Sequence, residues 1–201
     1  MTQQPFGSKR EQGKLQRRER LYDAALALFR SQGYEATTVD QISRQAGLAK
    51  GTFFNYFPTK DAVLRYMGTR EIGRLGTTVI SANNGTHSSV GKLKRLLAAL
   101  AISLQTDRDL VCLIFRRGIS VPDLLAGDAG GFSLQPLTSL LLRQSQRTGE
   151  INPHLDPDLL AAALDALYLQ QVVRWCEGKD QYDLGERLSG IVDLLLVGVT
   201  A

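Results

Sequence analysis

The side chains with the clearest capacity for specific chemistry lie in residues 37–60, TTVDQISRQAGLAKGTFFNYFPTK. The segment combines threonine hydroxyls, an asparagine amide, two lysine ammonium groups and several aromatic rings. It predicts two short helices separated by a tight turn, and the second helix is followed by a proline. A short helix presented after such a turn is the geometry that enters the major groove of DNA.

Local signals define both of these helices. Thr38 with Gln41 three residues later is a capping-box pattern, which fixes the start of the first helix. Gly47 can adopt the left-handed conformation that ends a helix and turns the chain sharply. The second helix, over 49–56, is too short to be stable alone, because one or two turns barely offset the cost of nucleation. We therefore expect neighbouring helices to hold it through aromatic packing.

Three stretches make this region specific: ALALFRSQGYEATTV (25–39), AGLAKGT (46–52) and FFNYFPTKDAVL (53–64). In order and spacing they resemble the DNA-binding half of the TetR family of bacterial transcriptional repressors. The resemblance covers roughly the first third of the chain. It implies a ligand-responsive regulator, most simply a repressor that binds a palindromic operator in double-stranded DNA as a homodimer and is released by a small, largely apolar effector.

The resemblance also implies which residues contact DNA. Thr38 and Lys60 match positions that meet phosphate, and Lys50 opens the recognition helix. The implied set is Thr38, Lys50, Gly51, Thr52, Phe54, Asn55, Tyr56 and Lys60. Phe53 and Phe57 flank this set and are expected in the core. For Tyr56 the alternative is a packed ring whose hydroxyl is satisfied within the protein.

Two residues depart from the pattern of many relatives. Ala49 stands where a serine or threonine would cap the recognition helix, so this cap is expected to be missing. Phe54 replaces a tyrosine and cannot donate a hydrogen bond to phosphate, although it keeps a surface for stacking or for a thymine methyl group.

The positive charge of the chain is concentrated near its beginning. Residues 1–60 hold ten Lys and Arg against five Asp and Glu, whereas 61–201 hold fourteen against fifteen. Such a surplus suits contact with phosphates. We expect residues 1–16 to be a flexible basic arm that settles on the DNA backbone when DNA is bound.

Composition favours a protein that folds around a substantial core and needs no cofactor. Of 201 residues, 43% are hydrophobic and 22% charged, and no stretch is apolar enough for a membrane span or signal peptide. We expect a cytoplasmic protein without membrane contact. His87 and His154 are isolated, so no metal site is expected. Cys112 and Cys176 are far apart and are expected as buried thiols in a reducing compartment, a redox switch being the alternative.

The pattern predicts an all-α fold of about nine helices. The organisation expected is a flexible basic arm over 1–16, a three-helix helix-turn-helix DNA-binding domain over 17–62, and a helical effector-binding and dimerisation domain over 63–201. Helices are expected at 17–31, 59–79, 90–105, 108–119, 133–148, 157–177 and 184–199, while 83–89 reads as a loop and 121–132 as a connection or short helix. By resemblance, the last two helices form a four-helix bundle with a second copy. The alternative is that their apolar stripes belong to an internal core.

Effector-binding residues are expected in the second domain. The candidates are mostly apolar side chains with a few polar tips: Met67, Leu104, Phe115, Tyr168, Gln171 and Trp175. A DNA-bound structural or cell-cycle factor that senses nothing is one rival reading. A small helical enzyme or carrier is another, but the sequence shows no Ser/Cys–His–Asp set, carboxylate pair, phosphate-binding glycine loop or metal spacing, so we expect no enzymatic activity.

Overall fold

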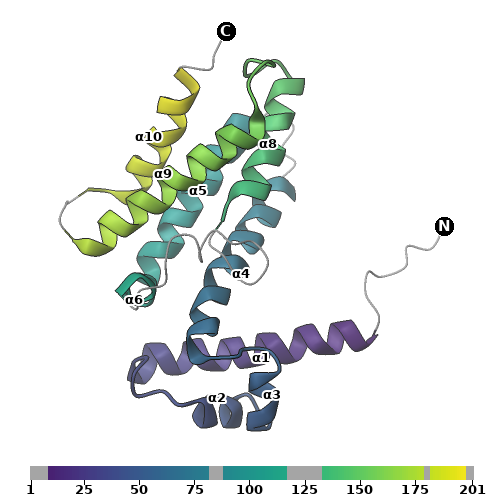
Figure 1. Ribbon diagram of the computed structural model, residues 1–201, viewed down its shortest axis with the longest axis vertical. Coiled ribbons are helices and arrows are strands. Elements are labelled where there is room, and N and C mark those ends of the chain that lie inside the picture. The colour runs from purple at the N-terminus through teal and green to yellow at the C-terminus, as the bar shows by residue number, and fades with distance from the viewer. Residues whose placement is uncertain (1–8, 82–87, 117–132, 179–181, 198–201) are drawn as a thin grey trace. The chain divides into compact units, whose positions relative to one another are not determined.

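The computed structural model describes residues 9–81, 88–116, 133–178 and 182–197. Within these ranges the chain forms nine α-helices and no strand, which confirms the all-α prediction (Figure 1). The helices are α1 Lys9–Gln32, α2 Val39–Gln45, α3 Lys50–Phe54, α4 Lys60–Ser81, α5 Ser89–Thr106, α6 Arg108–Arg116, α8 Gln135–Arg147, α9 Pro157–Glu177 and α10 Leu184–Val197. The predicted loop at 83–89 lies mostly outside the described residues, as does the end of the predicted helix 108–119. All of 121–132 lies outside them as well. No helix in the described part of the chain is long and apolar enough to cross a membrane.

The chain divides into two compact units, Met1–Leu64 and Arg65–Ala201. The division falls within α4, so this one helix starts in the first unit and continues through the second. Each unit has its own apolar core.

The first unit is held by aromatic and aliphatic side chains from α1, α2 and α3. Leu21, Ala25 and Ile42 are fully buried. Phe53 and Phe57 are 0% and 1% exposed, which confirms that these two rings belong to the core. Their ring centres lie 5.7 Å apart. The two rings therefore hold α3, which is only five residues long, against the rest of the unit.

α1 begins at Lys9, eight residues earlier than predicted. The expectation of a flexible arm over 1–16 is therefore wrong for residues 9–16, which are helical, while 1–8 lie outside the described residues. Residues 9–20, KREQGKLQRRER, consist largely of lysine, arginine, glutamate and glutamine, which are good helix formers even without burial. The polarity of these residues suggested a loose arm, but their high helix propensity extends α1 towards the N-terminus.

The second unit uses buried carboxylates to start its helices. Asp165 of α9, 2% exposed, accepts hydrogen bonds from the Leu134 backbone N–H at 2.8 Å and the Ser133 hydroxyl at 2.7 Å, just before α8 begins. Burial raises the pKa of Asp165 although these donors oppose the shift. Glu150 does the same for α5 by accepting from the Ser89 and Val90 N–H groups at 3.0 and 3.1 Å. These bonds satisfy backbone donors that a helix start leaves open.

The two cysteines form a disulfide that joins α6 to α9. Cys112 and Cys176 lie 64 residues apart in sequence, yet their Cα atoms are separated by 5.0 Å. The expectation of two separate buried thiols is therefore wrong. Sequence spacing contains no information on this pairing, because only the packing of α6 against α9 brings the two residues together.

Removing this disulfide should destabilise the second unit. In the chain-entropy model, closing a loop of 64 residues contributes about 4 kcal/mol by constraining the unfolded chain. We expect the double variant Cys112→Ser/Cys176→Ser to unfold at a lower urea concentration than the oxidised wild type. A reducing agent should lower the midpoint of the wild type and leave the double variant unchanged. Equal midpoints for wild type with and without reductant would contradict a stabilising cross-link.

Candidate nucleic-acid interface

The start of α2 is fixed by a reciprocal cap. The Thr38 backbone N–H donates to Gln41 Oε1 at 2.8 Å, and the Gln41 backbone N–H donates to Thr38 Oγ1 at 3.2 Å. The predicted capping box is therefore confirmed. The chain leaves α2 through Gly47, which has φ +62° as predicted. A backbone hydrogen bond from Leu48 to Ser43, 2.9 Å, closes this turn.

α3 exposes one side while its aromatic anchor is buried. Ala49 precedes it without a side-chain cap, as expected. Phe53 points into the core, whereas Phe54 is 49% exposed and meets Phe53 edge to face at 5.5 Å. Lys50 and Asn55 are exposed with Phe54, so the helix presents a cation, an amide and an aromatic surface to solvent.

Lys50 is held only by a surface ion pair. Its Nζ lies 2.8 Å from Asp40 Oδ2, and both side chains are 55% exposed. Such exposed pairs stabilise a fold by less than about 1 kcal/mol. The ammonium group can therefore exchange this carboxylate for a phosphate at little cost.

Gly51 has no packing reason to be glycine. A Cβ built at this position meets nothing within 4 Å, and its φ is not positive. Glycine disfavours a helix by about 1 kcal/mol relative to alanine. Its presence in an exposed first turn is understandable if another molecule's backbone must approach there.

Tyr56 and Lys60 are engaged within the protein. The Tyr56 hydroxyl accepts a hydrogen bond from Arg17 Nε at 3.0 Å, the local alternative considered for this residue. Lys60 Nζ donates to the carbonyl oxygens of Tyr34 and Thr37 at 2.6 and 2.8 Å, and lies 4.0 Å from the centre of the Tyr34 ring. Lys60 thereby fixes the loop that precedes the Thr38 cap.

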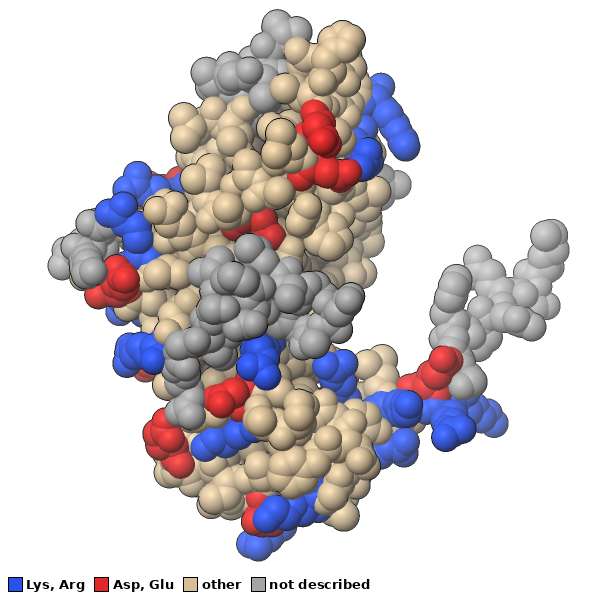
Figure 2. Space-filling view, in the orientation of Figure 1, with Lys and Arg blue, Asp and Glu red and all other residues tan. Residues whose placement is uncertain are grey.

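No local sequence pattern indicated the hydrogen bonds by which two arginines join α1 to this interface. Arg17 reaches Tyr56, and Arg20 Nη2 donates to the Ala46 carbonyl at 2.5 Å. These partners lie 39 and 26 residues away along the chain, so no local pattern could reveal them. Lys and Arg side chains gather over the N-terminal half of α1 (Figure 2).

The predicted effector residues are mainly interior side chains of the second unit. Met67, Leu104, Tyr168 and Trp175 are buried, while Phe115 and Gln171 are half-buried. The Tyr168 hydroxyl has no hydrogen-bond partner among the described residues, and burial raises its pKa. Arg108 stacks over the Trp175 ring with its guanidinium carbon 5.0 Å from the ring centre.

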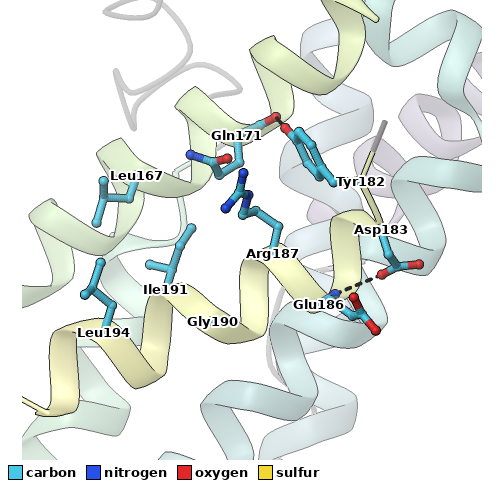
Figure 3. A pocket seen from close by; sticks show the side chains of 9 residues that line it. All are labelled: Leu167, Gln171, Tyr182, Asp183, Glu186, Arg187, Gly190, Ile191 and Leu194. Atoms are coloured by element: carbon cyan, nitrogen blue, oxygen red, sulfur yellow. Dashed lines mark hydrogen bonds between the residues drawn. The ribbon is translucent and has the colours of Figure 1, made fainter. Parts of the chain in front are cut away.

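Two open grooves lie on the second unit. One, about 830 Å³, runs between α9 and α10; Leu167, Ile191 and Leu194 line one end and Tyr182 and Asp183 the other (Figure 3). The other, about 500 Å³, lies between α4 and α8. Gln171 lines the first groove; the other five predicted effector residues line neither of these two.

The groove between α4 and α8 was not predicted. Its apolar walls come from Ile72, Ile80 and Leu137, and its floor from Gly73 and Gly76. A Cβ on Gly76 would lie 2.5 Å from Leu137 Cδ2, so this glycine allows α8 to approach α4 closely. Glycines three residues apart on one helix were the available sequence signal. Among the described residues, no His, Cys, Asp and Glu side chains group in a way that could hold a metal ion.

Comparison with known proteins agrees with this geometry. Residues 21–67 match the model for bacterial regulatory proteins of the tetR family. The HTH-type transcriptional repressor KstR of Rhodococcus jostii is 25% identical over 183 residues, which cover 90% of this chain and 83% of that protein. The fatty acid metabolism regulator protein of Bacillus subtilis is 25% identical over 189 residues, covering 89% and 93%. The crystal structure of Thermus thermophilus FadR, a TetR-family repressor in complex with lauroyl-CoA, is 30% identical with a TM-score of 0.76, covering 90% and 94%.

The helix-turn-helix unit followed by a larger helical unit defines a ligand-responsive, DNA-binding transcriptional repressor. The chain belongs to the TetR family of bacterial regulatory proteins. The curated relatives are transcriptional regulators, so the reading as an enzyme or a purely structural DNA-bound factor is not favoured.

Gly51 provides a test of how DNA meets α3. Gly51→Ala should raise the free energy of unfolding by up to about 1 kcal/mol, because alanine is the better helix former. The same variant should bind duplex DNA more weakly, because the new Cβ stands where a phosphate backbone approaches. Thermal unfolding and fluorescence anisotropy with labelled duplex measure the two effects.

Gly73→Ala is the matched control for Gly51→Ala. Gly73 is also a helical glycine with nothing within 4 Å of a built Cβ, but it lies on α4 in the second unit. It should stabilise the protein similarly and leave DNA affinity unchanged. DNA affinity of Gly51→Ala equal to that of the wild type would show that this position is not an approach site.

Proposed function

We propose that the protein represses transcription by binding a palindromic operator as a homodimer, and that a fatty acyl-CoA or another small molecule with a large apolar part releases it. The observation that carries the effector class is the 30% identity to a lauroyl-CoA-bound FadR over 90% of this chain. Acting on DNA, the protein works in the cytoplasm on the nucleoid.

Groove contact is assigned to the exposed side chains of Lys50, Phe54 and Asn55 and to half-buried Thr52, with Thr38 and Gly51 at the phosphate backbone. Helix N-termini and glycines allow this close approach. Tyr56 and Lys60 stand beside the same backbone, and their hydrogen bonds within the unit support them as positioning residues.

A second copy of the chain is the proposed occupant of the groove between α9 and α10. Leu159 and Leu194 are 69% and 70% exposed on these helices, and Leu167 and Ile191 line the same groove. An apolar strip on two adjacent helices is costly in water unless another surface covers it. A twofold dimer presents two recognition helices to successive major-groove segments, which is why the operator should be palindromic.

The effector is placed in the groove between α4 and α8. A volume of about 500 Å³ is within the usual range for small-molecule sites. Its lining runs along α4 from Thr69 to Ser81, about 18 Å at the helical rise, so it suits an elongated apolar molecule. Two glycines and two threonines on α4 replace larger side chains there and leave the space open.

A polar chain leads from this groove into the interior. Ser133 lines the groove and donates to Asp165, whose charge in turn acts on buried Tyr168. We retain Tyr168 as the polar group behind the site. Met67, Leu104, Phe115 and Trp175 stay predictions as effector contacts, since they do not line this groove. Gln171 also stays a prediction, but it lines the groove that is assigned to the second copy. The unpartnered Tyr168 hydroxyl supports a role in binding, because a buried hydroxyl without a partner is unfavourable in the empty protein.

α4 offers a physical route from effector to DNA. The helix begins with Lys60, which holds the loop before Thr38, and continues through the groove. A ligand changes DNA affinity only to the extent that it binds two states of the protein differently. The two states are proposed to differ in the placement of α4, whose first residue holds the Thr38 loop and whose later residues line the groove.

The proposed function is tested by selecting duplexes from a random library with the purified wild type. We expect a palindromic consensus with half-sites one helical turn or a multiple apart, and a dimer in sedimentation at micromolar concentration. Lauroyl-CoA should weaken operator binding by about 5- to 150-fold, the range of a coupling of 1–3 kcal/mol, while free CoA should not. A stable monomer that binds a single half-site tightly would refute the dimer. Full binding in saturating lauroyl-CoA would refute the effector class and leave the DNA-binding function standing.

A variant at Gly73 tests whether the effector binds in the groove between α4 and α8. Gly73→Leu adds an apolar side chain to the lining of the groove, at a position where nothing lies within 4 Å of a built Cβ. The variant should bind the operator like the wild type and lose most of its response to lauroyl-CoA, as measured by anisotropy.

Thr78→Leu is the matched control for the groove. It adds the same side chain to an exposed position of α4 that does not line the groove. It should keep the full response to lauroyl-CoA. A normal response in Gly73→Leu would place the effector elsewhere in the second unit.

A further inference from the structure

The N-terminal half of α1 carries a stripe of cations on one face. Arg10, Lys14 and Arg17 are spaced i, i+4 and i+7, so they lie along one side of the helix. The next position of the same stripe is Leu21, which is fully buried in the core of the first unit. Glu19 falls on the opposite side. The face that forms the core at Leu21 therefore becomes cationic where α1 extends beyond the core.

This stripe is continuous with the DNA-binding surface. Arg17 donates to the Tyr56 hydroxyl just beyond α3, which shows that this side of α1 is turned towards the recognition helix. Arg20 strengthens the same connection by bonding the Ala46 carbonyl at the end of α2. Lys14 and Arg10 lie about one and two turns further out on α1 than Arg17 and are exposed.

No interaction within the described residues explains Arg10 and Lys14. Neither side chain makes an ion pair or hydrogen bond there. Cations in the first turns of a helix are also unfavourable with the helix dipole, and Gly13 between them weakens the helix further. Their placement lowers the stability of the free protein, so the benefit must come from a negatively charged partner.

The reach of the stripe matches DNA that flanks the recognition site. From Leu21 to Arg10 the helix extends about 16 Å, which is nearly five phosphate spacings at about 3.4 Å along one strand. The partner is double-stranded DNA because the stripe continues the surface of α3, which enters the major groove.

We propose that Arg10, Lys14 and Arg17 bind phosphates of the DNA flanking each operator half-site, outside the segment read by α3. The stripe adds affinity that depends on salt and on flanking length but not on flanking sequence. This inference rests on the proposed operator binding.

The test is the double variant Arg10→Gln/Lys14→Gln, titrated by anisotropy between 50 and 300 mM salt with the duplex selected by the wild type. Each lost phosphate contact lowers the salt slope by about 0.9. Two contacts in each of two subunits should therefore lower it by about three to four units, and weaken binding by more than tenfold at about 0.1 M salt. The charge-preserving variant Arg10→Lys/Lys14→Arg should keep the slope of the wild type.

Arg116→Gln/Arg147→Gln is the matched control. It removes the same net charge from exposed helix ends in the second unit and should leave the slope nearly unchanged. A slope reduced equally in both double variants would mean that net charge alone is responsible, and would overturn the inference.

Trimming the flanks gives an independent readout. On a duplex cut flush with the half-sites the wild type should lose affinity, whereas Arg10→Gln/Lys14→Gln should bind the long and the trimmed duplex alike. Equal losses on trimming for both proteins, or an unchanged salt slope with operator affinity intact, would refute the stripe and leave the proposed function standing. Failure of the wild type to select any duplex would refute both.

Discussion

The burial of Phe53 and Phe57 is the constraint on which the DNA-binding unit depends. α3 has five residues and no side-chain cap, so it cannot be stable as an isolated helix. Two fully buried rings hold it in place, and their burial leaves Lys50, Phe54 and Asn55 on the outer side. The same interaction therefore stabilises the helix and orients its exposed face.

Around this anchor, long-range hydrogen bonds fix the backbone. Lys60 bonds the carbonyls of Tyr34 and Thr37, and Arg20 bonds that of Ala46. Hydrogen bonds to charged groups contribute about 1.5–3 kcal/mol each. In the second unit, buried Asp165 and half-buried Glu150 play a similar part at the starts of α8 and α5. Both units thus use charged side chains to terminate loops and helices.

Small residues decide where the second unit remains open. Gly76 lets Leu137 approach α4 closely, while nothing fills the space beside Gly73. The result is a groove with apolar walls beside α4, whose first residues belong to the DNA-binding unit.

The sequence by itself determined the features that depend on neighbouring residues. The Thr38–Gln41 cap, the left-handed Gly47, the uncapped start at Ala49 and the span of α9 were all predicted correctly, because each is set within one or two turns of chain. The start of α1 was missed because low burial was given more weight than helix propensity.

Only the tertiary structure decided the pairing of Cys112 with Cys176, the bond from Arg17 to Tyr56 and the groove beside Gly73. Each of these brings together parts of the chain that are distant in sequence. Their proximity follows from how whole helices pack, which no local pattern of side chains encodes.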